Sequence, residues 1–97
     1  MVRHIFLWSV KDGEDGGAVL EALAQLRDRV PGIRGWSIGA HEGTSPNSSA
    51  GKWQYALTCD FDSFADLDAY QEHPFHQELV TKVGPSYQDW AILDYTI

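Results

Sequence analysis

Four short segments of this chain are patterned as β-strands. They span residues 3–10, 33–40, 53–61 and 90–97, and each is rich in β-branched or aromatic residues. Segment 53–61 is the clearest, because apolar side chains alternate there with mostly polar ones, as in a half-buried strand. Segment 3–10 carries apolar side chains on both of its faces, so we expect apolar surface on both sides of the sheet.

Two longer segments are patterned as helices. Segment 17–30 has apolar residues at helical spacing and is followed by a proline–glycine pair, which ends helices. The second helical segment opens on Ser63, a good N-cap, and contains Pro74, which prevents simple continuation of a helix. We therefore expect one helix that ends near residue 73 and a second, short helix over residues 74–83.

The resulting order is strand, helix, strand, strand, helix, strand, which is the βαββαβ order of the ferredoxin-like plait. Because 97 residues suit one domain, we expect a single α+β domain over residues 1–97 with an antiparallel sheet. Its helices would cover one sheet face. Exposed apolar area on the other face predicts a homodimer through the open sheet faces, which closes into an α/β barrel. The side chains expected on that face are Ile5, Leu7, Ala56, Leu93 and Tyr95.

Composition narrows the partners and the compartment. Seven basic and fourteen acidic residues give a formal net charge of −7, and such a surface repels nucleic-acid phosphates. No segment has the length needed to span a bilayer, and the apolar N-terminal stretch lacks a cleavage site, so no membrane partner is expected. Cys59 is the single cysteine, which fits a reducing compartment. We expect a cytoplasmic protein.

The stretch YQEHPFH, from Tyr70 to His76, offers acid–base chemistry. Pro74 suits the first position of a new helix, with His73 near its cap and His76 in its first turn. Positive charge at a helix N-terminus disfavours imidazolium, so His76 is expected to be a neutral base. Tyr70 would stay protonated and donate a hydrogen bond. This pair suits enolisation next to a carbonyl, without a cofactor.

Two other interpretations of this stretch stay open. A His-Pro pair is also a common way to break a helix, and a tyrosine on an amphipathic helix often only packs its ring in the core. His73 and His76 have the spacing of metal ligands, and His4 and His41 are candidates for a third. The sequence fixes no third ligand, so we expect no metal.

Several stretches match, in order, one known family. They are Val2 to Trp8, Val30 to Ile33, Phe61 to Ser63, Tyr70 to His76, and Asp94-Tyr95. With these stretches the whole chain resembles the stress-responsive dimeric α/β-barrel proteins, called Dabb domains, which include the plant olivetolic acid cyclase. That cyclase performs an intramolecular aldol condensation without metal or redox cofactor, whereas other members of the family are stress proteins or have no known activity. The resemblance places the acid/base pair of that polyketide cyclase on Tyr70 and His76 and its first-strand histidine on His4, whereas a third-strand histidine is replaced by Tyr55.

Strand alternation also predicts the wall of a ligand cavity between sheet and helices. The candidate substrate-binding residues are His4, Phe6, Trp8, Leu23, Trp36, Tyr55, Leu57, Leu79, Trp90 and Ile92. Such a wall suits a small hydrophobic ligand, and His4 needs a hydrogen-bond partner if it is buried. The alternative is that the tryptophans fill this layer as a solid core. The loop over residues 42–51 is a candidate lid.

Two functions therefore compete. The first is a small-molecule-binding dimeric barrel that acts on a hydrophobic carbonyl compound as a polyketide cyclase, lyase or isomerase. The second is a non-catalytic stress-responsive barrel in which the His-Pro-x-His motif is structural. An oxygen-dependent monooxygenase is a third interpretation, but no residue pattern typical of that group stands out.

Overall fold

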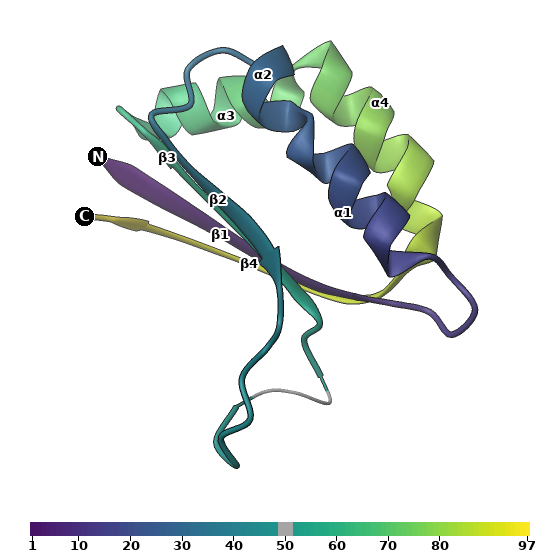
Figure 1. Ribbon diagram of the computed structural model, residues 1–97. Coiled ribbons are helices and arrows are strands. Elements are labelled where there is room, and N and C mark those ends of the chain that lie inside the picture. Colours follow the sequence, from purple (N-terminus) through teal and green to yellow (C-terminus); the bar gives the residue numbers. More distant parts are fainter. Residues whose placement is uncertain (49–51) are drawn as a thin grey trace.

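The computed structural model describes residues 1–48 and 52–97, and over these residues the chain forms a four-stranded sheet with helices on one face (Figure 1). The strands are β1 (Val2–Val10), β2 (Gly35–Ala40), β3 (Tyr55–Phe61) and β4 (Tyr87–Thr96). Their order across the sheet is β2-β3-β1-β4, and all neighbours pair antiparallel. This arrangement confirms the predicted ferredoxin-like α+β fold.

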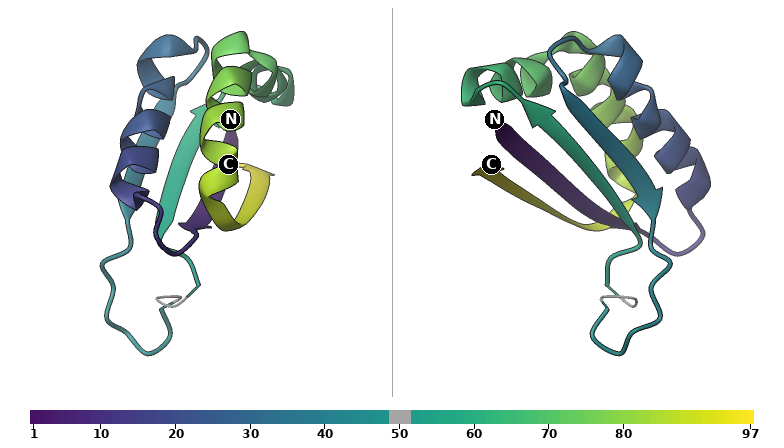
Figure 2. Two further views of the ribbon diagram at one scale, coloured as in Figure 1. Left: turned by 90° about the vertical axis from the view of Figure 1, so that its right-hand side faces the viewer. Right: turned by 60° about the vertical axis from the view of Figure 1, so that its left-hand side comes forward.

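The helices form a single layer over the sheet (Figures 1 and 2). They are α1 (Gly16–Ala24), α2 (Leu26–Arg29), α3 (Phe64–Glu72) and α4 (Pro74–Val83), followed by the 3₁₀ turn η1 (Gly84–Ser86). The single helix predicted over residues 17–30 is divided in two at Gln25. The Gln25 backbone N–H donates to the carbonyls of Ala22 and Leu23, which tightens the turn there.

The break between α3 and α4 is built as the sequence predicted. The Ser63 hydroxyl accepts a hydrogen bond from the Asp66 backbone N–H at 3.2 Å and so caps α3. His73 is extended (φ −60°, ψ 135°), and its Nδ1 accepts from the Phe75 backbone N–H at 3.1 Å. Pro74 opens α4. His73 is therefore both the end of one helix and the cap of the next.

Strand register decides which side chains face the helices. On β1, His4 lies opposite Cys59 and Asp94, whereas Phe6 and Trp8 lie opposite the next alternate residues of β3 and β4. Directly opposed residues share a sheet face, so one helix-facing layer runs across all three strands. The most deeply buried side chains of the core are Trp8, Tyr70, Phe61, Leu26, Leu57 and Cys59.

Among the described residues, no helix lies over the opposite sheet face (Figure 2). Register places Ile5, Leu7, Ala56, Leu93 and Tyr95 on this face. Leu93 is 61% exposed and Tyr95 is 40% exposed. This open sheet face is therefore apolar near its β4 edge.

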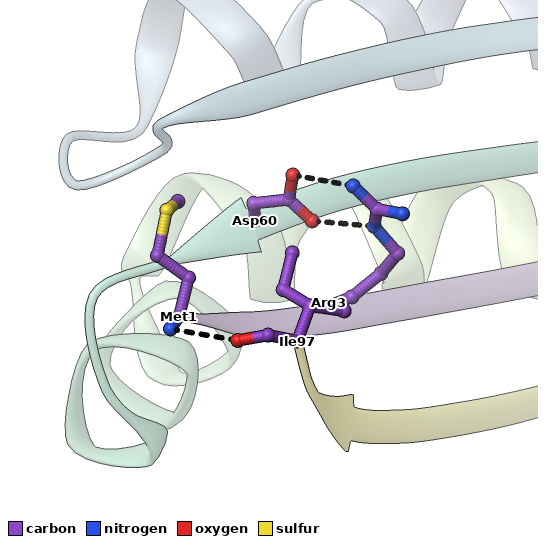
Figure 3. Close-up of polar contacts among 4 residues, drawn as sticks. All are labelled: Met1, Arg3, Asp60 and Ile97. Carbon is purple, nitrogen blue, oxygen red and sulfur yellow. Dashed lines mark hydrogen bonds and ion pairs between the residues drawn. The ribbon is translucent and has the colours of Figure 1, made fainter.

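Arg3 and Asp60 form an ion pair on the open sheet face, near the paired chain termini (Figure 3). The guanidinium donates two hydrogen bonds to the carboxylate, at 2.9 and 3.1 Å. This bidentate pair lowers the pKa of Asp60. Gly35 faces Asp60 across β2 and β3, and a Cβ there would lie 2.6 Å from the carboxylate, so only glycine leaves the ion pair undisturbed.

Candidate active site

A cavity of about 330 Å³, partly open to solvent, lies in the layer between the sheet and the helices. Its walls are mostly apolar, and three of the polar lining side chains, those of Tyr70, Gln71 and His76, come from the junction of α3 and α4. The lining residues are His4, Phe6, Leu23, Leu26, Leu57, Tyr70, Gln71, His76, Val80, Gly84, Tyr87, Trp90 and Ile92. The helix-facing layer is therefore partly hollow, which contradicts the alternative of a solid tryptophan-filled core.

Tyr70 and His76 meet at this cavity. Tyr70 comes from the last turn of α3 and is 2% exposed, whereas His76 comes from the first turn of α4. Their ring centroids lie 4.7 Å apart at an interplanar angle of 64°. On one continuous helix, residues six apart would point in different directions. The extended residue His73 and the following Pro74 bring these two rings together.

His4 contacts the same phenol ring from β1. The centroids of His4 and Tyr70 lie 6.0 Å apart in an edge-on arrangement. The His4 side chain is buried, and its Nδ1 lies 2.5 Å from a carboxylate oxygen of Asp94. The prediction that a buried His4 needs a partner is thus confirmed, and that partner is the residue directly opposite on β4.

Burial sets the protonation of this cluster. The pKa of His76 lies below its ordinary value of 6.5, chiefly because burial disfavours the charged ring and also because His4 is close. The sequence predicted a neutral His76 from the positive helix terminus, whereas in the structure burial is the main cause of the lowered pKa. Burial also raises the pKa of Tyr70, and nearby Cys59 adds to this effect. The site therefore holds a neutral base beside a protonated phenol.

Cys59 lies beneath this cluster and is fully buried. Burial raises the pKa of its thiol to about 12, so almost no thiolate forms near neutral pH. The thiol is therefore a packing group and not a nucleophile.

Four of the predicted wall residues do not line the cavity. Trp8 is fully buried between Phe6 and Tyr55, with ring centroids 5.2 and 5.4 Å from its own, so it fills the core. Tyr55 and Trp36 pack against the edge of the same core, and Leu79 belongs to it. Strand alternation placed Trp8, Trp36 and Tyr55 on the helix-facing side correctly, but it does not distinguish hollow from filled parts of a layer.

Trp90 and Ile92 do line the cavity, as predicted, but they are not enclosed by it. They are 59% and 45% exposed, and Val80 of α4 is 43% exposed beside them. β4 is an edge strand, so its helix-facing side chains extend past the helical layer. These three side chains form the mouth of the cavity.

Sequence reasoning missed five lining residues, which are Leu26, Gln71, Val80, Gly84 and Tyr87. Tyr87 is the most informative, because its hydroxyl is buried without a hydrogen-bond partner among the described residues. Burial raises the pKa of this phenol to about 12. Alternation counted from Trp90 would place Tyr87 on the opposite sheet face. The register shift between Ser9 and Val10 instead turns its ring toward the helices, where its centroid lies 5.6 Å from that of Phe6, and no sequence signal marks this shift.

The remaining candidate features lie elsewhere. Residues 49–51 of the candidate lid lie outside the described residues, and the rest of that loop extends beyond the ends of β2 and β3 without lining the cavity (Figure 1). Across residues 1–48 and 52–97, no three histidine, cysteine, aspartate or glutamate side chains converge as metal ligands would. Among the described helices, none combines the length and apolar character needed to cross a bilayer.

Comparison with known proteins identifies the architecture. Residues 2–97 match the stress responsive A/B barrel domain, Dabb. No curated protein sequence matches the chain. Three solved structures show the same fold over 99% of the chain. They are a hydroxynitrile lyase from Passiflora edulis (22% identity, 92% of its chain, TM-score 0.85), a dimeric ferredoxin-like protein from Thermobifida fusca (24%, 90%, 0.81) and a Dabb family protein from Mesorhizobium loti (17%, 95%, 0.80).

Proposed function

Since the chain belongs to the stress-responsive A/B barrel (Dabb) family, we propose that it binds a compact hydrophobic carbonyl compound and moves a proton next to the carbonyl. The reaction would be that of a cofactor-independent cyclase, isomerase or lyase. One observation carries this proposal: the imidazole of His76 and the phenol of Tyr70 meet at the wall of a largely apolar cavity.

The two side chains have complementary roles in such a reaction. A neutral His76 accepts the proton from the carbon next to the carbonyl, because burial lowers the pKa of its ring. Tyr70 stays protonated and donates a hydrogen bond to the oxygen on which negative charge develops. The product is an enolate, whose negative charge is delocalised over the carbon and the oxygen. The enolate can attack a second carbonyl (cyclase), regain a proton at another carbon (isomerase) or expel a leaving group (lyase).

Cavity size and walls suggest the kind of ligand. Ligand sites in proteins span roughly 300 to 1,000 Å³, so a cavity of about 330 Å³ suits a compact molecule better than a long flexible chain. Phe6, Tyr87 and Trp90 offer aromatic surfaces to it. An aromatic or cyclic carbonyl compound fits these properties.

A structural relative supports the presence of a small-molecule site on this scaffold. The Passiflora edulis protein with a TM-score of 0.85 is a hydroxynitrile lyase. An identity of 22% indicates a shared fold but not a shared reaction. The relative therefore supports only the idea that a barrel of this shape can hold a small-molecule lyase site.

The open sheet face is the proposed dimer interface. The Thermobifida fusca relative is a dimeric ferredoxin-like protein. A second copy on this face would cover the exposed side chains Leu93 and Tyr95. It would also cover a hollow of about 530 Å³ on the sheet near the β2–β3 loop, lined in part by Leu7, Ala56 and Thr58.

The competing function is a non-catalytic stress-responsive barrel. One observation favours it: the His73 ring caps α4, so half of the His-Pro-x-His motif has a purely structural task. In that case the packing of the Tyr70 ring against the His76 ring would serve only to hold α3 and α4 together. Activity on a simple carbonyl probe separates the two functions.

The test is deuterium exchange at the methyl group of acetophenone in D₂O, followed by proton NMR. This probe reports proton removal next to a carbonyl and does not require the natural substrate. We expect the wild-type protein to accelerate exchange and His76→Gln to reduce the rate to that of buffer, because general base catalysis typically contributes about 10²- to 10⁴-fold.

His41→Gln is the matched control, since it makes the same replacement at an exposed histidine outside the cavity. Wild-type exchange at the buffer rate would favour the non-catalytic barrel. Equal rates for His76→Gln and wild type would remove His76 from the proposed chemistry.

A further inference from the structure

Asp94 is a charged residue next to the candidate site, and the proposed reaction gives it no role. Its carboxylate lies 2.5 Å from Nδ1 of His4, in a contact between directly opposed residues of β1 and β4. The side chain of His4 is 5% exposed and that of Asp94 is 28% exposed. The carboxylate is thus partly exposed to solvent and contacts a buried imidazole that lines the cavity.

A carboxylate can only accept hydrogen bonds, so Nδ1 of His4 must carry the proton in this contact. In the neutral ring, Nε2 then has the free lone pair. A free imidazole in water has no such constraint from a neighbour. The contact with Asp94 therefore selects one tautomer of His4.

We propose that Asp94 is a positioning residue that holds His4 as the Nδ1–H tautomer, with Nε2 available to a ligand in the cavity. This inference rests on the proposed function for its consequence in catalysis, but not for its geometry. Tyr70 contacts both His4 and His76, so the cavity then offers two imidazole nitrogens around one phenol. His4 is placed to bind or shuttle the proton that His76 removes.

The first experiment reads the tautomer directly. Long-range proton–nitrogen NMR of the ¹⁵N-labelled 97-residue chain, at a pH where its histidines are neutral, distinguishes protonated from bare ring nitrogens. We expect protonated Nδ1 for His4 in the wild type and loss of that preference in Asp94→Ala. Asp94→Asn keeps an oxygen that can accept from Nδ1, so it should restore the preference.

Asp89→Ala is the matched control, because Asp89 is on the same strand but pairs with Lys52 at 3.5 Å and not with a histidine. It should leave the His4 tautomer unchanged. Protonated Nε2 in wild-type His4, or an unchanged tautomer in Asp94→Ala, would overturn the inference. If Asp94→Ala does not fold, as judged by circular dichroism, the wild-type tautomer and Asp94→Asn decide the question.

The second experiment separates this inference from the proposed function. In the acetophenone assay, Asp94→Ala should lower kcat while KM changes little, and Asp94→Asn should recover part of the loss. A changed tautomer with no wild-type exchange activity would support the positioning by Asp94 and refute only the proposed reaction. An unchanged tautomer would refute the positioning whatever the activity.

Discussion

The pKa of His76 is lower in the folded chain than in a free imidazole. A free imidazole gains a proton near pH 6.5, but burial and the nearby His4 lower the pKa of His76 in the folded chain. As pH falls through the ordinary value, the unfolded chain binds this proton first. The contribution of His76 to stability is therefore present above pH 6.5 and is lost as pH falls toward the folded pKa. The same shift keeps the base active at lower pH.

The pH dependence of catalysis follows from this shift. If His76 is the base, kcat/KM for acetophenone exchange should hold its plateau down through pH 6.5 and fall only below it, because the neutral ring persists there. Rates measured from pH 5 to 8 in wild type and His76→Gln check this expectation. An acid limb centred above pH 6.5, or one that persists in His76→Gln, would contradict it.

For single residues, the sequence predicted which side chains belong to the candidate site better than it predicted their contacts. Tyr70, His76 and His4 could be chosen because their side chains carry chemistry and because alternation places His4 toward the helices. The contact between His4 and Asp94 could not be predicted, since it depends on the register between the first and last strands, 90 residues apart. The filling of the core by Trp8 depends on how its ring packs between Phe6 and Tyr55, which residue spacing does not encode.

Among the elements, the junction of α3 and α4 matters most for the site. A capped start at Ser63, a cap near His73 and an opening Pro74 were all predicted from local rules, because each depends on neighbours within a few residues. The division of the first helical segment at Gln25 was not predicted, since no proline or glycine marks it. Strand bounds differed by up to three residues, as in β4, which begins at Tyr87.

At the scale of the whole molecule, the exposed apolar side chains of β4 belong to two regions. One is the mouth of the cavity, with Trp90 and Ile92, and the other is the open sheet face, with Leu93 and Tyr95. They alternate along β4 and so face opposite sides of the sheet. The proposed ligand and the proposed second copy would therefore occupy separate regions, and strand alternation was sufficient to assign these side chains to the two faces.

The proposed dimer gives a test on the open sheet face. Leu93→Lys places a charge where a second copy would bury apolar surface, so it should shift sedimentation equilibrium from dimer toward monomer. Phe64→Lys is the matched control, because Phe64 is 51% exposed on α3, away from this face. Dissociation in the control alone, or a dimeric Leu93→Lys protein, would place the interface elsewhere.

The most direct measurement is a titration of the ring-labelled 97-residue chain with acetophenone, followed by NMR. The account holds that the cavity is a binding site formed around Tyr70, His76 and His4. Saturable shifts of these three rings, with the signals of Tyr95 on the open sheet face unchanged, are the predicted result. Unchanged signals for all three rings at saturating probe, or shifts at Tyr95 alone, would contradict the account.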